Sequence, residues 1–194
     1  MIPVRFQHAK YEDVPAKIQA LFDAIPKSKR GLYIHGNVGT GKTHFAYALK
    51  KKWDVPTTVE ASKKDNSVKV SKGRTAIFWN TTELLREMRR DFDSEQKSNV
   101  VDYLLDNDNE SLLFLDDLGS EKMSDWVAET FYLIINSRYN NVVPTIFTSN
   151  FCIPDLAERI GERTVSRIVE MCDVVELVGS DRRQINSKKI PIKI

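Results

Sequence analysis

A glycine-rich octapeptide has the residue types and spacing of a phosphate-binding loop. Residues 36–43 read Gly-Asn-Val-Gly-Thr-Gly-Lys-Thr and match G-x-x-x-x-G-K-[ST] at every fixed position. Glycines let backbone N–H groups curl around phosphate oxygens, Lys42 can reach the terminal phosphates, and the Thr43 hydroxyl can ligate Mg²⁺. The segment therefore predicts a nucleoside triphosphate site. Its candidate binding residues are Gly36, Asn37, Val38, Gly39, Thr40, Gly41, Lys42, Thr43 and His44.

Two adjacent acids follow the most apolar run of the sequence. Residues 112–115 are Leu-Leu-Phe-Leu, and Asp116 and Asp117 come directly after them. Phosphoryl transfer needs a carboxylate for Mg²⁺ and a group that activates the attacking water. Neighbouring residues of a strand point to opposite faces, so the two acids would have different roles. We expect Asp116 to hold the metal together with Thr43, and Asp117 to polarise the water; the alternative is a pair of solvated acids in a turn.

Three more side chains are candidates for a hydrolytic site. Asn150 ends a Thr-Ser-Asn run, where its amide could orient the water, although such a triplet is also ordinary turn chemistry. Arg163 and Arg167 are four residues apart and project from the polar side of a predicted helix. Such a pair is usually solvated, but in a phosphoryl-transfer protein it is a candidate arginine finger. A finger acts on a neighbouring subunit's nucleotide, so this role requires self-association.

Alternating strands and helices must position these groups. Predicted strands cover residues 32–35, 75–79, 111–116, 144–148 and 174–178. Apolar residues at helical spacing lie between them, in residues 43–52, 81–107, 125–139 and 154–171. This alternation favours an α/β fold, a parallel sheet with helices on both faces. Residues 55–74 are polar and rich in lysine, so we expect an exposed insert there, either a loop or a small hairpin.

Composition narrows the class of protein. The 194 residues, of 22.3 kDa, suit one domain, and 41% hydrophobic with 29% charged residues is ordinary for a globular chain. Apolar runs fall far short of the roughly 20 residues that cross a bilayer, and the N-terminus has no export signal, so we expect a cytoplasmic protein without membrane contact. Two cysteines and three scattered histidines predict neither a disulfide scaffold nor a zinc site. A net charge of +2 decides little about partners.

Several segments together resemble one family, the AAA+ ATPase domain of the DnaC/DnaI bacterial helicase loaders and their IstB transposition relatives. They are Gly31-Leu-Tyr-Ile-His-Gly, Gly39-Thr-Gly-Lys-Thr-His-Phe-Ala, Phe114-Leu-Asp-Asp-Leu-Gly-Ser-Glu-Lys, Thr148-Ser-Asn and Gly161-Glu-Arg-Thr-Val-Ser-Arg-Ile. The lead-in, residues 1–30, is also similar over residues 6–15. The resemblance implies a five-stranded sheet of order 5-1-4-3-2, ATP with Mg²⁺, and assembly into a spiral or ring. About 16 residues follow Val178, so we expect the usual C-terminal lid to be absent or vestigial, which departs from the AAA+ pattern.

The resemblance also implies roles for individual residues. Asn150 would be the sensor I residue, with Arg167 the first candidate for the arginine finger and Arg163 the second. Arg182 or Arg183 would make a sensor II-like contact, and Tyr11 would lie near the adenine. The helical insert at residues 81–107 matches the position of helices that touch single-stranded DNA. The arginines that could contact its phosphates are Arg86, Arg89 and Arg90.

Three functional hypotheses remain open from the sequence. The first is an ATP-hydrolysing replication factor that binds single-stranded DNA and loads a replicative helicase. Only about 30 residues precede the first predicted strand, whereas loaders carry a separate helicase-binding domain, so helicase docking is in question. The second hypothesis is an IstB-like ATPase that delivers a transposase to target DNA. The third is an ATP-gated assembly switch with negligible turnover, because Asp117 is shorter than the glutamate common at its position.

Overall fold

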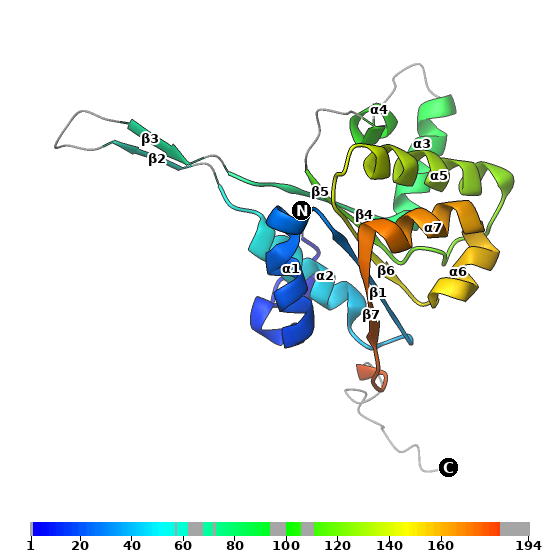
Figure 1. The fold of residues 1–194 in the computed structure, drawn as a ribbon, viewed down its shortest axis with the longest axis horizontal. Helices are drawn as coiled ribbons and strands as arrows, with labels where there is room; N and C mark the ends of the chain where they lie inside the picture. Colours follow the sequence, from blue (N-terminus) through cyan, green and yellow to red (C-terminus); the bar gives the residue numbers. More distant parts are fainter. Residues whose placement is uncertain are drawn as a thin grey trace, which may run out of the picture.

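The computed structural model describes residues 2–56, 58–61, 68–71, 73–93, 100–105 and 111–182. At its centre is a five-stranded parallel sheet in the order β4-β5-β6-β1-β7 (Figure 1). The strands are β1 (Gly31–Gly36), β4 (Ala76–Asn80), β5 (Leu112–Asp116), β6 (Thr145–Ser149) and β7 (Cys172–Leu177). Strands β2 (Thr58–Ala61) and β3 (Val68–Ser71) lie outside this sheet. If the five strands of the sheet alone are numbered 1 to 5 along the chain, their order starting from β7 is 5-1-4-3-2. The predicted fold class and strand order are therefore confirmed.

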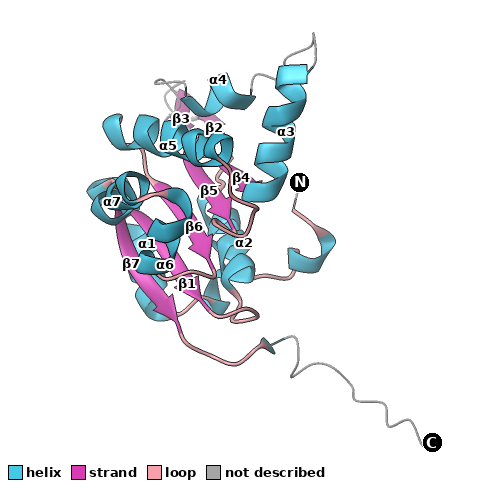
Figure 2. Cartoon of the chain, turned by 90° about the vertical axis from the view of Figure 1, so that its right-hand side faces the viewer, coloured by secondary structure: helices cyan, strands magenta, loops and turns pink. Residues whose placement is uncertain are grey.

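Helices cover both faces of the sheet (Figures 1 and 2). On one face lie α1 (Ala16–Ser28) and α2 (Lys42–Trp53), preceded by the short 3-10 helices η1 (Val4–Phe6) and η2 (Tyr11–Asp13). The other face carries α3 (Thr81–Asp93), α4 (Val100–Leu105), α5 (Asp125–Asn140), α6 (Ile153–Ile160) and α7 (Glu162–Met171). No described helix combines the length and apolar character needed to cross a membrane.

Strand β5 shows why residues 112–115 are uniformly apolar. All five of its residues are buried. Leu112 and Phe114 point into the core beneath α1 and α2, whereas Leu113 and Leu115 point into the core beneath α5 and α7. Because side chains of a strand alternate between faces, a strand covered on both sides needs apolar residues throughout. Asp116 at its end is also buried, but its carboxylate accepts hydrogen bonds from Thr43 and Thr148.

The two inserts differ in how they relate to the sheet. Strands β2 (Thr58–Ala61) and β3 (Val68–Ser71) form a separate antiparallel hairpin that projects from the body, so of the two predicted forms for residues 55–74 the hairpin is observed (Figure 1). Residues 81–93 and 100–105 of the second insert form α3 and α4, and the remainder of that insert lies outside the described residues. The lid prediction concerns the chain after β7, and the part of it beyond residue 182 also lies outside the described residues.

Candidate functional site

The glycine-rich loop connects β1 to α2 at the carboxyl edge of the sheet, as predicted. Gly39 and Gly41 have φ angles of 80° and 101°, in the left-handed region that side chains with a Cβ rarely adopt. A Cβ at Gly39 would also collide with the Asp181 side chain. The backbone path of the loop therefore depends on glycine at these positions.

Lys42 is held at this loop by main-chain carbonyl groups. It is the first residue of α2, its side chain is buried, and its ammonium donates to the carbonyl oxygens of Gly36, at 2.7 Å, and Asn37, at 2.9 Å. A buried cation must be hydrogen-bonded, and here the loop's own carbonyls meet that need. The positive charge thus lies against the loop that the sequence assigns to phosphates.

Thr43 and Asp116 lie together although they are 73 residues apart in sequence. The Thr43 hydroxyl donates to Asp116 Oδ2 at 3.2 Å, and the Thr148 hydroxyl donates to Asp116 Oδ1 at 2.6 Å. Burial raises the pKa of the Asp116 carboxyl, an effect that the two hydroxyl hydrogen bonds oppose. A hydroxyl and a carboxylate side by side are the oxygen donors that Mg²⁺ prefers, so this pair fits the predicted metal position.

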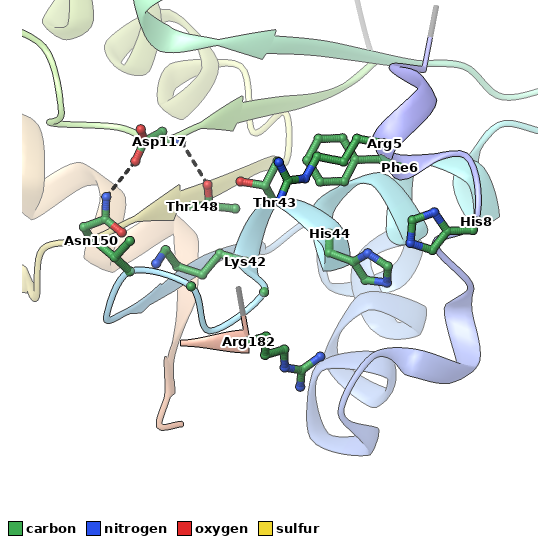
Figure 3. Close-up of a pocket in the computed structure, with 13 residues that line it drawn as sticks. Arg5, Phe6, His8, Lys42, Thr43, His44, Asp117, Thr148, Asn150 and Arg182 are labelled. Carbon is green, nitrogen blue, oxygen red and sulfur yellow. Dashed lines mark hydrogen bonds between the residues drawn. The ribbon is translucent and has the colours of Figure 1, made fainter. Parts of the chain in front are cut away.

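The backbone and side chain of Asp117 are both held in place. Its φ of 64° lies in the left-handed region. Its N–H donates to Thr148 Oγ1 at 2.9 Å, and its carbonyl accepts from the hydroxyls of Thr81, at 3.0 Å, and Ser120, at 2.8 Å. Asn150 Nδ2 donates to Asp117 Oδ1 at 2.9 Å (Figure 3). The structure thus brings together the two residues that were predicted to act on the attacking water.

A buried carboxylate behind Asp117 was not identified from the sequence. Glu121 accepts hydrogen bonds from the Thr81 hydroxyl and the Gly119 N–H, each at 3.3 Å. Burial raises the pKa of Glu121, which these bonds partly offset. Thr81 is the first residue of α3, so the network joins the loop after β5 to that helix. Residues 119–121 have the composition of an ordinary exposed turn, so the sequence does not indicate that Glu121 is buried.

A cavity of about 620 Å³ opens between these groups, a size typical of ligand sites (Figure 3). Its lining residues are Arg5, Phe6, His8, Val38, Gly39, Gly41, Lys42, Thr43, His44, Asp117, Thr148, Asn150 and Arg182. Most of them are residues singled out in the sequence. Phe6 and His8 lie within residues 6–15, which the family resemblance already covers, although neither was singled out. Arg5 was missed, because nothing local in the sequence indicates that η1 folds against α2.

The C-terminal end of the described chain also reaches the loop. Arg182 N–H donates to the Gly39 carbonyl at 3.0 Å, and the Arg182 guanidinium lies 5.1 Å from the centre of the Phe45 ring. Arg183 is outside the described residues. Tyr11 is not part of the cavity lining: its hydroxyl donates to the Gln19 carbonyl at 3.2 Å. Its predicted position near the adenine gains no support from this arrangement.

Both finger candidates lie on α7, away from the cavity of their own chain. Arg167 donates to Asn136 Oδ1 at 2.8 Å, and its guanidinium lies 5.0 Å from the centre of the Tyr132 ring on α5. Arg163 is exposed, and its guanidinium lies 5.2 Å from the same ring. Neither arginine lines the cavity, so a role on the nucleotide of the same chain is not indicated.

The three arginines of α3 differ in their surroundings. All three are exposed. The Arg89 guanidinium lies 4.8 Å from the centre of the Trp126 ring, and Arg90 forms a 3.2 Å ion pair with Glu87 one turn earlier on the helix. Among the described residues, no hydrogen bond or ion pair engages Arg86. Arg86 is therefore the most available cation of this helix.

Comparison with known sequences identifies the family. The sequence model of the IstB-like ATP binding proteins matches residues 24–190. The chain belongs to this family. Its members bind ATP, and the strand order and loop described above are those of the AAA+ P-loop proteins.

Several of the similar proteins have names from bacterial DNA replication. The replicative helicase loader DnaI of Bacillus subtilis is 28% identical over 170 residues, which cover 79% of this chain and 48% of that protein. The crystal structure of the DnaC helicase loader superposes with a TM-score of 0.70 at 28% identity, covering 91% of this chain and all of that one. The structure of the replication initiator DnaA bound to AMPPCP and single-stranded DNA is 18% identical and shares the fold, with a TM-score of 0.66 over 90% of this chain and 51% of that one. The chain spans about half the length of the curated relatives it matches.

The buried charge of Asp116 predicts a pH-dependent effect on stability. Asp116→Asn keeps the shape and the acceptor for Thr148 but removes the charge. Burial raises the pKa of Asp116 in the folded state. The charged carboxylate therefore destabilises the native protein at pH values above the ordinary pKa of an aspartate. With a metal chelator present, we expect the variant to unfold at a higher temperature than the parent chain at pH 8. This difference in unfolding temperature should shrink as the pH falls through the raised pKa of Asp116. Thermal unfolding followed by circular dichroism from pH 5 to 8 measures it; a variant less stable at pH 8 would contradict the account.

The Thr148 hydroxyl predicts a second effect. Thr148→Val leaves the Asp117 N–H without its acceptor and removes one donor from Asp116, so we expect a loss of about 1–3 kcal/mol in the free energy of unfolding. The matched control is Ser120→Ala, because the Asp117 carbonyl keeps its bond from Thr81; it should cost less than about 0.5 kcal/mol. Urea denaturation compares the two, and equal losses would refute this role of Thr148.

Proposed function

We propose that this chain binds Mg²⁺ and ATP in the cavity and hydrolyses the bond that joins the terminal phosphate to the rest of ATP. The observation that carries the proposal is the placement of a complete phosphate-binding loop with its Thr43 hydroxyl 3.2 Å from the buried carboxylate of Asp116. Thr43 and Asp116 would hold the metal, which neutralises charge on the phosphate oxygens when bound. Lys42 and the loop amides would bind the phosphates.

In this proposal Asp117 and Asn150 act on the attacking water. The 2.9 Å bond from the Asn150 amide to one oxygen of Asp117 fixes the direction of that carboxylate. The strained backbone of Asp117 is restrained by Thr148, Thr81 and Ser120, so its carboxylate is placed before substrate arrives. Preorganised groups of this kind contribute to catalysis because no reorganisation is needed when the reaction occurs.

We further propose that hydrolysis requires a second subunit. The cavity lining contains no described residue of α7, whereas the two arginines of that helix point to α5 at the molecular surface. Arg167, or else Arg163, would serve the nucleotide of a neighbouring protomer in a spiral or ring. ATP at such a boundary would couple binding to assembly, and slow turnover would follow for the isolated chain.

The biological role that we propose is that of a helicase-loader-type replication factor acting on single-stranded DNA. It is favoured over transposase delivery because two of the relatives that cover most of this chain, DnaI and DnaC, are named as helicase loaders. The exposed arginines of α3, Arg86 above all, would contact DNA phosphates. The chain spans only about half of DnaI, and we propose a replicative helicase as its partner.

Two substitutions test the catalytic assignment. Lys42→Ala should abolish both nucleotide binding and ATPase activity. Arg167→Ala should reduce turnover at least tenfold while leaving nucleotide affinity within about twofold, because a finger stabilises charge in the transition state of the neighbouring site. Calorimetry with a non-hydrolysable ATP analogue and single-turnover phosphate release, each with and without single-stranded DNA, measure the two properties.

The control for this pair is Lys17→Ala, an exposed cation on α1. Full activity in Arg167→Ala would reject the finger assignment. If the parent chain binds ATP but releases no phosphate under either condition, the protein is an assembly switch rather than a hydrolase.

A third variant tests the DNA contact. Arg86→Ala should weaken binding to a single-stranded oligonucleotide. The negative slope of the logarithm of the association constant against the logarithm of salt concentration should become shallower by about 0.7, the value for one lost phosphate contact. Lys17→Ala again serves as control. Fluorescence anisotropy between 50 and 200 mM salt measures the slope, and an Arg86→Ala slope equal to that of the parent chain would exclude this residue from the interface.

A further inference from the structure

The N-terminal lead-in is attached to the helix that follows the phosphate-binding loop. The Phe6 ring of η1 stacks on Tyr47 of α2, with ring centres 4.7 Å apart and an interplanar angle of 18°. Tyr47 in turn stacks on Phe78 of β4 at 4.1 Å, so this aromatic column reaches into the sheet. Each such contact adds to the burial of apolar surface. The position of η1 relative to the loop is therefore determined by packing.

A second set of contacts fixes the same segment further along. The Lys51 ammonium on α2 donates to the carbonyl oxygens of Gln7, at 2.9 Å, and Ala9, at 2.8 Å. The Ala9 side chain is fully buried against the body of the protein. Together with the aromatic column, these bonds hold the residues on either side of Gln7 in place. Arg5, next to Phe6, shares this fixed backbone.

Arg5 projects from this segment into the cavity. It lines the same cavity as Thr43 (Figure 3). Its side chain is exposed, and within the described part of the chain its guanidinium makes neither a hydrogen bond nor an ion pair. An arginine held at a cavity wall with its five donors unused has no evident structural task there.

The place of Arg5 within the cavity indicates which part of a ligand it would meet. Thr43 pairs with Asp116, so this side of the cavity is the metal end, where the β- and γ-phosphates of a bound triphosphate belong. Lys42 is already bonded to loop carbonyls, and Arg182 lies over the Phe45 ring. Arg5 adds a cation that approaches the metal end from the lead-in. A guanidinium suits this position because its planar fork matches two phosphate oxygens.

We propose that Arg5 binds the terminal phosphate of the nucleotide bound to its own chain, so that the lead-in distinguishes ATP from ADP. This inference rests on the proposed function, since it names a further binding residue of the same site. Arg5 lies in the lead-in, which is separate from the phosphate-binding loop, from the two acids after β5 and from the arginines of α7. Loss of the terminal phosphate removes the group that Arg5 contacts while leaving the contacts of the loop itself.

The experiment compares affinities of the full chain for an ATP analogue and for ADP. Arg5→Ala should weaken binding of the non-hydrolysable ATP analogue with Mg²⁺ about tenfold and change ADP binding less than twofold, because a charge-assisted phosphate contact is lost only for the triphosphate. Arg5→Lys, which keeps the charge but not the fork, should fall between. The matched control is Lys10→Ala, an exposed cation of the same lead-in that does not line the cavity. Isothermal titration calorimetry provides both affinities.

Each outcome bears on a defined claim. If Arg5→Ala binds the ATP analogue as tightly as the parent chain, or loses equal affinity for both nucleotides, the inference is overturned while the proposed ATP site stands. If the parent chain binds neither nucleotide, the proposed function fails, and the role of Arg5 fails with it. Unfolding temperatures of Arg5→Ala and Lys10→Ala should match that of the parent chain, since neither residue is buried.

Discussion

The Thr148 hydroxyl is the contact on which the candidate site depends. It donates to the buried carboxylate of Asp116 and accepts from the backbone N–H of Asp117, so one oxygen atom at the end of β6 restrains two consecutive acids at the end of β5. The first acid carries a charge that burial disfavours, and the second has a left-handed backbone. Both conditions cost free energy that must be offset by surrounding contacts. The parallel pairing of β5 with β6 supplies those contacts and separates the roles of the two carboxylates.

The sheet topology explains why residues from distant parts of the chain meet here. In the register of the sheet, His35 pairs with Ser149 and Asn80 pairs with Asp116, so β1, β4, β5 and β6 all end at one edge. Ligands of open α/β sheets bind at the carboxyl ends of the strands, and the cavity lies there. The same edge carries Thr81, which connects Asp117 and Glu121 to the start of α3. The candidate nucleotide site and the proposed DNA-binding helix are thus joined by direct hydrogen bonds.

The predictability of each part follows from the range of the interactions involved. The phosphate-binding loop was recognisable because glycine, lysine and threonine act within eight consecutive residues. The strands were recognisable from local apolar runs, although β7 begins two residues earlier than expected. Strand order came from the family resemblance, because periodicity alone does not say which strands are neighbours. Tyr11 was assigned to the adenine side by the same resemblance, whereas in the structure its hydroxyl bonds to Gln19 outside the cavity.

The sequence by itself determined the chemistry of the loop, the identity of the two acids and the alternation of strands and helices, since these depend on backbone conformation and on side chains close together in the chain. Only the tertiary structure decided that Glu121 is buried, that Asn150 bonds to Asp117, and that Arg5 enters the cavity. Each of these depends on packing. Glu121 is buried because α3 and α6 cover the loop after β5, and the Asn150 bond depends on the pairing of β5 with β6. The place of Arg5 depends on the stacking of η1 against α2. Such contacts form when buried apolar surface aligns separate elements, and no local pattern encodes the alignment.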